Sequence, residues 1–420
     1  MNSLKKYSSY KDSGVEWLGQ IPEHWETLSN KNIFKIKQKL VGKKSSEYDL
    51  LSLTLKGIIK RDMENPQGKF PAEFNTYQEV KKGDFVFCLF DVEETPRTVG
   101  LSSFDGMITG AYTVMTTENI DKGYLYYFYL NLDSSKRFKP LYRGLRNTIP
   151  KDSFFSFKTF IPPNEEQIKI ASFLDEKTAQ IDEVISQKEK LIELLKERKQ
   201  IVINDAVTKG LDKDVEMTDS GVEWIGKIPK HWKLLANKYV FNLKKNLVGK
   251  KSNEYDLLSL TLEGIIKRDL DKGGKFPAEF NTYQEVKKGD FVFCLFDVEE
   301  TPRTVGLSKY DGMITGAYTV FSVKNINKEY LYYFYLNLDS KKRLKPLYTG
   351  LRNIISKDNF FSFKSFIPPK DEQIKIVEYI ENQTTKIDKA IELQQNYISK
   401  LKEYKASLID SVVTGKVRVA

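Results

Sequence analysis

Cysteine and histidine are scarce in this sequence, with two of each among 420 residues. Two thiols cannot build a disulfide framework or a four-thiolate zinc site, and two histidines leave little for metal or general-base chemistry. Long apolar runs are also missing, since Phe85–Phe90 and Tyr124–Leu130 are far too short to cross a bilayer. The start, Met1–Lys11, is polar and has no signal-peptide core. We therefore expect a reduced, soluble protein of the cytoplasm.

Apolar and basic residues are plentiful. Hydrophobic residues make up 40% of the chain and aromatic residues 13%, which excludes a disordered protein. The length favours about two to four domains. The 67 Lys and Arg residues outnumber the 57 Asp and Glu residues, and the net charge of +10 favours an acidic partner such as nucleic acid.

The chain contains an internal repeat. Asp12–Trp17 returns as Asp219–Trp224, and Gly68–Ser102 is identical, letter for letter, to Gly274–Ser308. A period of about 200 residues is far longer than a solenoid repeat, which spans roughly 20–50 residues. The repeat is therefore a duplicated unit of several parts.

Each copy begins with a segment of mixed character, Ile21–Pro163 and Ile228–Pro369. Short apolar runs such as Asp84–Phe90 predict buried strands, and Lys82-Gly-Asp84 predicts a hairpin turn before that strand. Lys122–Lys136 has a more helical pattern. An α+β fold is the expectation for each mixed segment.

A long helix is predicted after each mixed segment. Asn164–Val207 contains neither Pro nor Gly, and its apolar residues recur every seven positions. The seam positions are Leu174, Ile181, Lys188, Leu195 and Val202 in the first copy, and Ile380, Ile387, Gln394, Leu401 and Leu408 in the second. Such a stripe is typical of a helix that pairs with another helix, although a long core helix is the alternative.

The two stripes suit each other as partners. Two like units in one chain are most simply related by a two-fold axis, which makes the helices antiparallel. About 44 residues of helix span roughly 65 Å, nearly two turns of B-DNA. Acids after Pro163 suit a helix start, and Gly210 and Gly415 suit the two helix ends.

Four motifs, repeated in the same order, resemble the specificity subunit of type I restriction–modification enzymes. The motifs are Trp17-Leu-Gly-Gln-Ile-Pro-Glu-His-Trp25 with Trp224-Ile-Gly-Lys-Ile-Pro-Lys-His-Trp232, Gly144-Leu-Arg146 with Gly350-Leu-Arg352, Ile161–Ile168 with Ile367–Ile374, and Asp205–Gly210 with Ser411–Lys416. The resemblance covers nearly the whole chain. It implies target-recognition domains at 1–163 and 211–369, a spacer helix at 164–210, and a second spacer helix with a tail at 370–420.

The resemblance implies a DNA reader without catalytic residues. Each recognition domain would read one half of a bipartite site, and two antiparallel helices would set the spacer and bind methylase subunits, two in number. A translocase–endonuclease subunit could join, and S-adenosylmethionine, ATP and magnesium would belong to these partners. The family normally carries two different recognition domains. Near-identical domains predict near-identical, inverted half-sites, which form an interrupted palindrome.

Basic residues in repeated polar turns are the candidate DNA contacts. They are Lys43, Lys44, Lys60, Arg61, Arg97, Thr98 and Arg146 in the first copy, and Lys250, Lys251, Lys267, Arg268, Arg303, Thr304 and Arg352 in the second. Arg97 and Arg303 are the foremost candidates for base contact, because arginine can bind guanine at two atoms. Ion pairs with Glu93–Glu94 or Glu299–Glu300 are the alternative for these two arginines. A solvated turn is the alternative for Lys43, Lys44 and their copies, and structural pairing is the alternative for Arg146 and Arg352.

Other distinctive residues are interpreted as structural. His24 and His231 are expected to pack in their turns, and Cys88 and Cys294 to be buried thiols. Trp17, Trp25 and their copies are expected to anchor a small core. Tyr124–Tyr129 could stack on bases, but its helical spacing is more typical of a core helix.

Two other functions remain open from the sequence. A DNA-modifying or DNA-cleaving enzyme is one, but Asn65-Pro66 is followed by Gln67 and not by a methylase-type Pro-aromatic pair, and there is no phosphate-binding loop. Glu79-Val-Lys81 has the spacing of metal-dependent nucleases without an identifiable acidic partner. The other is a structural adaptor, which would differ from a DNA reader in lacking salt-sensitive duplex binding.

Overall fold

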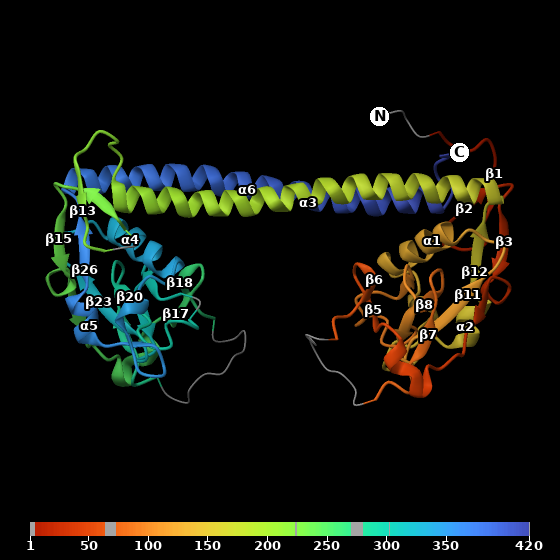
Figure 1. The fold of residues 1–420 in the computed structure, drawn as a ribbon, viewed down its shortest axis with the longest axis horizontal. Helices are drawn as coiled ribbons and strands as arrows, with labels where there is room; N and C mark the ends of the chain where they lie inside the picture. Colours follow the sequence, from red (N-terminus) through yellow and green to blue (C-terminus); the bar gives the residue numbers. More distant parts are fainter. Residues whose placement is uncertain (1–4, 64–72, 223–224, 270–279, 302, 420) are drawn as a thin grey trace. The chain divides into compact units, whose positions relative to one another are not determined.

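The computed structural model describes residues 5–63, 73–222, 225–269, 280–301 and 303–419 (Figure 1). It divides into two compact units, Met1–Lys188 with Gln395–Ala420, and Glu189–Gln394. Each unit holds the mixed segment of one repeat, which we call its head, and one part of each long helix. These helices are α3 (Asn164–Lys209) and α6 (Lys370–Val413). Trp224, Asn65, Pro66 and Pro302 lie outside the described residues.

The described part of head 1 combines short strands with two helices and three 3-10 turns. Its strands are β1 (Tyr10–Asp12), β2 (Gln20–Pro22), β3 (Glu26–Ser29), β4 (Phe34–Ile36), β5 (Leu51–Thr54), β6 (Gly57–Lys60), β7 (Gln78–Val80), β8 (Phe85–Phe87), β9 (Val99–Leu101), β10 (Gly106–Ile108), β11 (Thr113–Thr117) and β12 (Lys158–Ile161). Its helices and turns are η1 (Asn30–Asn32), η2 (Gly42–Glu47), α1 (Lys122–Ser134), η3 (Lys139–Leu141) and α2 (Lys151–Ser156).

The head of unit 2 repeats this order, and the hairpin that is an isolated bridge between Arg143 and Thr148 in head 1 is here a pair of two-residue strands, β24 and β25. Its strands are β13 (Met217–Asp219), β14 (Lys227–Pro229), β15 (Lys233–Ala236), β16 (Phe241–Lys244), β17 (Leu258–Thr261), β18 (Gly264–Lys267), β19 (Gln284–Val286), β20 (Phe291–Phe293), β21 (Val305–Leu307), β22 (Gly312–Ile314), β23 (Thr319–Val323), β24 (Tyr348–Thr349), β25 (Ile354–Ile355) and β26 (Lys364–Ile367). Its helices and turns are η4 (Asn237–Tyr239), η5 (Gly249–Glu254), α4 (Lys328–Ser340), η6 (Lys345–Leu347) and α5 (Lys357–Ser362).

An antiparallel four-stranded sheet, in the order β4-β11-β8-β9, forms the centre of head 1. Phe85 and Phe87 of β8 contact the ring of Phe34 on one side of this sheet. Val86 and Cys88 belong to a second apolar cluster on the other side. The run Asp84–Phe90 therefore contains a strand that is buried on both faces, as predicted, and Cys88 is a buried thiol. The same holds for Cys294 in head 2, and burial raises the pKa of both thiols.

The turn before β8 differs from the prediction. Lys81–Asp84 does form a tight turn, in which Asp84 N donates to Lys81 O and Gly83 has φ +88°. However, β7 pairs with β10, whereas β8 pairs with β9 and β11. The hairpin prediction was wrong because both strands find their partners later in the chain.

Helix α1 covers part of this core. The Asp121 carboxylate accepts from Tyr124 N and caps the helix start. Tyr124 and Tyr129 are fully buried, and their hydroxyls donate to Phe160 O and Asn30 Oδ1. The aromatic run Tyr124–Tyr129 is thus part of a core helix, as its helical spacing predicted. The buried rings of Tyr124 and Tyr129 are not free to stack on bases.

Helices α3 and α6 pair within each unit. In unit 1, Lys405 Nζ lies 2.6 Å from Asp182 Oδ2, and Lys188 Nζ lies 4.9 Å from the ring centre of Tyr397. Rising residue numbers on α3 therefore meet falling numbers on α6, so the helices are antiparallel. In unit 2 the corresponding ion pair joins Lys199 and Asp388 at 2.7 Å.

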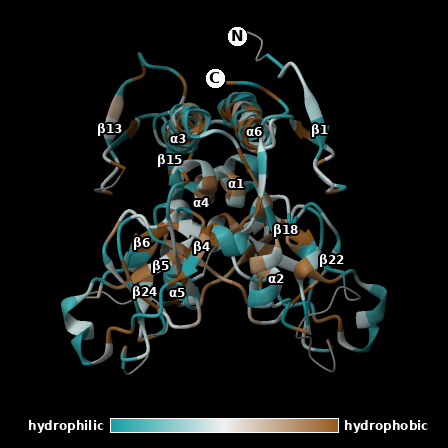
Figure 2. Cartoon of the chain, turned by 90° about the vertical axis from the view of Figure 1, so that its right-hand side faces the viewer, coloured by the Kyte–Doolittle hydropathy of each residue, from teal (hydrophilic) through white to brown (hydrophobic). Residues whose placement is uncertain are grey.

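The heptad positions of the two helices are buried or half-buried, and Ile380 packs in the apolar core of head 2. Those that are buried are Leu174, Ile181, Ile380, Ile387 and Leu408, and those that are half-buried are Lys188, Leu195, Val202, Gln394 and Leu401. Both helices are amphipathic, with hydrophilic and hydrophobic residues on each (Figure 2). None of the helices in the described ranges is long and apolar enough to span a bilayer.

A carboxylate in the first turn of α3 binds head 1 to the helix. Glu166 Oε1 accepts from Trp25 Nε1 at 3.1 Å and from the Tyr7 hydroxyl, while Oε2 lies 2.8 Å from His24 Nε2. In unit 2, Glu372 contacts Trp232 and His231 in the same way. The opening motif and the helix-start motif of each repeat are therefore in direct contact.

His24 and His231 hold a structural position in their turns. Their side chains are 46% and 43% exposed, and each ring lies within hydrogen-bonding distance of the carboxylate in the first turn of a long helix. Trp25 and Trp232 are buried as expected, whereas Trp17 is half-buried beneath the guanidinium of Arg137.

A buried glutamine next to this carboxylate binds two further parts of the head. Gln167 Oε1 accepts from Asp121 N, and Gln167 Nε2 donates to Pro162 O, both at 2.7 Å. Gln373 makes the matching bonds to Asn327 N and Pro368 O. One amide thus connects the end of the last head strand, the start of the head helix and the long helix.

The end of the other long helix completes each junction. Gly415, after α6, has φ +74° and lies against Pro22 and Trp25 of head 1. Gly210, after α3, also has φ +74° and lies against Trp232 and Glu372 of unit 2. Each head is therefore attached to the start of one long helix and the end of the other.

Gly415→Ala should lower the free energy of unfolding by about 2 kcal/mol, because the new Cβ would crowd Pro22 and lie 3.3 Å from Trp25 at an unfavourable φ. Gly14→Ala is the matched control, since Gly14 has φ +68° with open space around it. Urea unfolding of both variants measures the difference. Equal losses for the two glycines would contradict the packing argument.

One contact between head and helix has an acidic partner in unit 1 and a neutral partner in unit 2. In unit 1, Asp410 of α6 pairs with Arg137 Nη1 at 2.7 Å. In unit 2, the neutral Asn204 of α3 accepts from Arg343 Nη1 at 2.9 Å. Burial acts to raise the pKa of Asp410, but hydrogen bonds from Lys416 and Arg137 hold that pKa below its usual value.

A lowered folded-state pKa stabilises the fold above the pKa of the unfolded chain, about 3.9 for aspartate, and this contribution is lost as the pH falls through the folded value. Asp410→Asn should therefore cost about 1 kcal/mol at pH 7, and the difference from the unchanged protein should close below about pH 4. Asn204→Asp is the reciprocal variant and should gain acid-sensitive stability. Urea unfolding across pH tests both, and a pH-independent difference would contradict the ion-pair assignment.

Candidate nucleic-acid interface

Lys43 and Lys44 lie on η2, a short turn mounted on a small apolar cluster. Val41, Leu50 and Met107 are buried beneath this turn. Both lysines are exposed, and within the described part of the chain neither forms an ion pair. Their side chains are therefore available to a phosphate.

Unit 2 repeats this arrangement. Lys250 and Lys251 are exposed on η5, above buried Val248, Leu257 and Met313. The two copies therefore present the same pair of lysines on the same kind of support.

Lys60 and Lys267 are half-exposed partners of neighbouring acids. Lys60 Nζ pairs with Asp49 and lies 5.5 Å from the ring centre of Phe104. Lys267 repeats this with Asp256 and Tyr310. Such surface pairs contribute little stability, about 0–1 kcal/mol, so a phosphate could replace the acid at low cost.

Arg61 and Arg268 are the residues directly after Lys60 and Lys267. The backbone N–H groups of these two arginines donate to Leu50 O and Leu257 O, both at 2.8 Å. The side chain of Arg61 is half-buried and that of Arg268 is exposed.

The foremost base-contact candidates are mostly enclosed. The Arg97 side chain is 18% exposed, with Nη1 3.5 Å from Asp133 Oδ2 and Nη2 donating to Leu55 O at 3.1 Å. This favours the ion-pair alternative, although the acid is Asp133 of α1 and not Glu93 or Glu94. In unit 2, Arg303 Nη2 likewise donates to Leu262 O.

The neighbouring threonines do not face solvent. Thr98 is 0% exposed and Thr304 is 1% exposed, and the Thr304 N–H donates to Asp339 Oδ2. As placed here, neither threonine can contact DNA, because the surrounding core covers both. Each threonine directly follows an arginine in a polar stretch of the sequence, so the sequence alone predicted an exposed position for both.

Arg146 and Arg352 lie on the surface, at the tips of matched hairpins. Arg146 is exposed, and its carbonyl accepts from Asp91 N at 2.8 Å. Arg352 is 77% exposed, with Nη2 3.6 Å from Asp297 Oδ2. Arg146 is exposed, and the ion pair of Arg352 is long, so the guanidinium groups of both residues are accessible.

One backbone bond joins this hairpin to a neighbouring loop, and a side-chain bond joins that loop to a third segment. The loop that contains Asp91 and Arg97 contacts the hairpin through Asp91, and it contacts the β5–β6 turn through Arg97. The structure thus assembles three separate segments into one surface of head 1. Lys43 and Lys44 belong to a different segment, beside β7.

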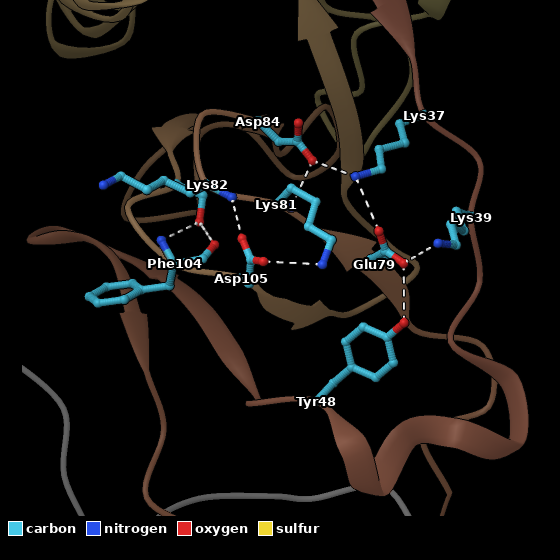
Figure 3. Close-up of polar contacts among 10 residues, drawn as sticks. Lys37, Lys39, Tyr48, Glu79, Lys81, Lys82, Asp84, Phe104 and Asp105 are labelled. Atoms are coloured by element: carbon cyan, nitrogen blue, oxygen red, sulfur yellow. Dashed lines mark hydrogen bonds and ion pairs between the residues drawn. The ribbon is translucent and has the colours of Figure 1, made fainter.

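A charged network that the sequence did not reveal includes Tyr48, the residue directly after η2 (Figure 3). Lys37 Nζ lies 2.8 Å from Asp84 Oδ2 and 3.6 Å from Glu79 Oε1, and Lys39 lies 2.6 Å from Glu79 Oε2. The Tyr48 hydroxyl donates to the same oxygen of Glu79. Lys39, together with Tyr48 and Lys37, holds the pKa of Glu79 below its usual value against the effect of burial.

The Glu79-x-Lys81 spacing is explained by this network. Glu79 binds Lys39, whereas the Lys81 ammonium binds Asp105 at 3.1 Å. The two residues of the nuclease-like triplet therefore serve separate ion pairs. In the described ranges, no group of three or more His, Cys, Asp or Glu residues is placed to hold a metal.

Comparison with known proteins agrees with the architecture. No protein-family model matches the chain. The chain is 24% identical to the putative specificity subunit of the type I restriction enzyme MjaX of Methanocaldococcus jannaschii, over 96% of both chains. It is 25% identical to the specificity subunit of the enzyme MjaVIII of the same organism, and that match spans 64% of each chain. The resemblance to type I specificity subunits is confirmed.

A solved structure supports the fold. A chain from a study of complex assembly and conformational transition in a type I restriction–modification system superimposes with a TM-score of 0.69. The match covers 94% of this chain and 98% of that chain, at 11% sequence identity. The likeness in fold therefore extends over both heads and both long helices.

Lys44→Gln combined with Lys251→Gln should weaken duplex binding about equally for all sequences. If both lysines contact phosphates, the slope of log affinity against log salt should fall by about two. Lys158→Gln with Lys364→Gln is the matched control, because these lysines are exposed at equivalent positions of β12 and β26. Binding titrations across salt concentrations measure the slopes, and an unchanged slope would remove η2 and η5 from the interface.

Proposed function

We propose that this chain is the DNA-reading specificity subunit of a type I restriction–modification complex. The observation that carries the proposal is the alignment with a named specificity subunit over 96% of both chains, joined to a fold that repeats one head on paired long helices. The net charge of +10 and the exposed lysines of η2 and η5 suit a polyanionic duplex.

In this proposal each repeat reads one half of a bipartite site. The segments 1–163 and 211–369 are the recognition domains, and 164–210 and 370–420 are the spacer helices with a C-terminal tail. Gly68–Ser102 and Gly274–Ser308 are identical, so the two copies offer the same side chains to bases over that stretch. Like side chains favour like half-sites, and inverted half-sites form an interrupted palindrome.

The proposal assigns catalysis to partner subunits. Two methylase subunits would bind the long helices, whose solvent-facing sides carry exposed apolar residues such as Leu194 and Leu393. Translocase–endonuclease subunits would join them. S-adenosylmethionine, ATP and magnesium would be bound by these partners, and the complex would act on DNA in the cytoplasm.

Mapping methylated adenines in the host genome tests the proposal. We expect one interrupted motif whose two halves are near-inverted copies, and the motif should disappear when the gene for this chain is deleted. Two unrelated half-sites would contradict the palindrome, while an unchanged methylation pattern in the deletion strain would contradict the proposed function.

The long helices should set the spacer. Inserting four residues into both α3 and α6 adds roughly 6 Å of helix, which corresponds to about one or two base pairs of duplex. The mapped motif should gain that many unspecified positions and keep its half-site letters. An insertion that alters the letters and leaves the gap unchanged would contradict the role of the helices.

A further inference from the structure

One leucine in each head is completely exposed. Leu145 and Leu351 have a relative exposure of 104%, the highest of any large apolar residue in the described part of the chain. Isolated surface leucines are common and need no explanation. These two require one because they occupy the same position of both repeats, between Gly and Arg, at the tip of a hairpin.

The hairpin in head 1 holds its leucine in a defined place. Arg143 and Thr148 exchange backbone hydrogen bonds at 2.8 and 3.0 Å, and Gly144 and Asn147 both adopt positive φ, +67° and +44°. The tip is attached to the head because Arg146 O accepts from Asp91 N. A rigid support removes much of the entropy cost of presenting a side chain to a partner.

Head 2 builds the same support. Strands β24 and β25 pair as a hairpin, and Gly350 and Asn353 have φ +69° and +46°. Asp297 N donates to Arg352 O at 3.0 Å. Both copies therefore form the same exposed tip with an asparagine at positive φ, a conformation that non-glycine residues adopt rarely.

A comparison of the two repeats separates the tip from its surroundings. Arg143 and Thr148 of the first hairpin are replaced by Thr349 and Ile354 in the second. The four tip residues, Gly-Leu-Arg-Asn, are the same in both copies. The stem thus tolerates substitution, whereas the leucine and its arginine are retained together.

The surroundings of the leucine indicate the chemistry of the partner. Arg143, Gly144 and Arg146 are exposed beside Leu145, so the apolar side chain projects from a polar and positively charged surface. Protein partners usually cover larger apolar patches with central aromatic anchors. A single apolar side chain next to arginine is instead typical of proteins that insert a wedge between stacked bases.

We infer that Leu145 and Leu351 are wedges that enter a base step of each half-site, while Arg146 and Arg352 bind the adjacent phosphates or base edges. This inference rests on the proposed DNA-reading function and adds a specific mode of contact to it. A wedge favours steps that unstack easily, such as pyrimidine–purine steps, so it contributes to sequence preference without a hydrogen bond to a base.

The experiment uses the full chain and duplexes that carry its mapped site, with 2-aminopurine placed in turn at each purine step. The unchanged protein should raise 2-aminopurine fluorescence at one step per half-site, away from the adenine that is methylated. Leu145→Ala with Leu351→Ala should abolish this signal and weaken specific binding about tenfold. Because both leucines are exposed, the variant should keep its melting temperature.

Three further variants separate the wedge from other effects. Leu145→Met with Leu351→Met should retain the signal, because methionine is also an apolar wedge. Leu40→Ala with Leu247→Ala is the matched control, since these leucines are 61% and 63% exposed elsewhere in both heads. Arg146→Gln with Arg352→Gln should reduce the salt slope by about two and keep the signal at saturating protein.

The outcomes distinguish this inference from the function on which it rests. Sequence-specific binding without a fluorescence change, or with equal affinity of the double alanine variant, would overturn the wedge and leave the DNA reader intact. Absence of sequence-specific duplex binding, together with an unchanged methylation map in the deletion strain, would overturn the proposed function itself.

Discussion

The attachment of each head to two different helix ends is the constraint on which the rest of the structure depends. One carboxylate in the first turn of a long helix, Glu166 or Glu372, accepts a hydrogen bond from a buried indole of the head. The glycine that ends the other helix lies against the same indole. A half-buried carboxylate needs such donors, because water no longer solvates it fully. A head therefore has its complete support only when both long helices are present and paired.

This constraint explains why unit 1 is built from two stretches that are far apart in the sequence, whereas unit 2 is one continuous segment. Unit 1 takes the beginning of α3 and the end of α6, and unit 2 takes the remaining parts. Antiparallel pairing in each unit brings a helix start beside a helix end, which is what each head requires. The motifs at the head opening, the helix start and the helix end contact one another in each unit. These contacts are the structural reason why all three motifs occur in both repeats.

The internal repeat also serves as a comparison between two solutions to the same structural problem. Asp410 pairs with Arg137 in unit 1, whereas Asn204 replaces the acid in unit 2. Lys39 binds Glu79 in head 1, whereas Glu285 in head 2 binds Asn246 and Lys287. The supporting charges thus vary between copies while the hairpin tip and the lysines of η2 and η5 do not. Variation is tolerated where another donor can satisfy a buried carboxylate.

The sequence by itself determined the duplication, the two long helices and the aromatic core helix. Heptad spacing and the absence of Pro and Gly are local properties, and local hydrogen bonds form a helix. Only the tertiary structure decided which strands pair and which arginines face solvent. Arg97 stands among polar residues in the sequence, yet it pairs with Asp133, which lies on α1 beyond strands β9, β10 and β11. Burial and strand pairing depend on contacts between distant segments, and these contacts exist only after the chain has folded.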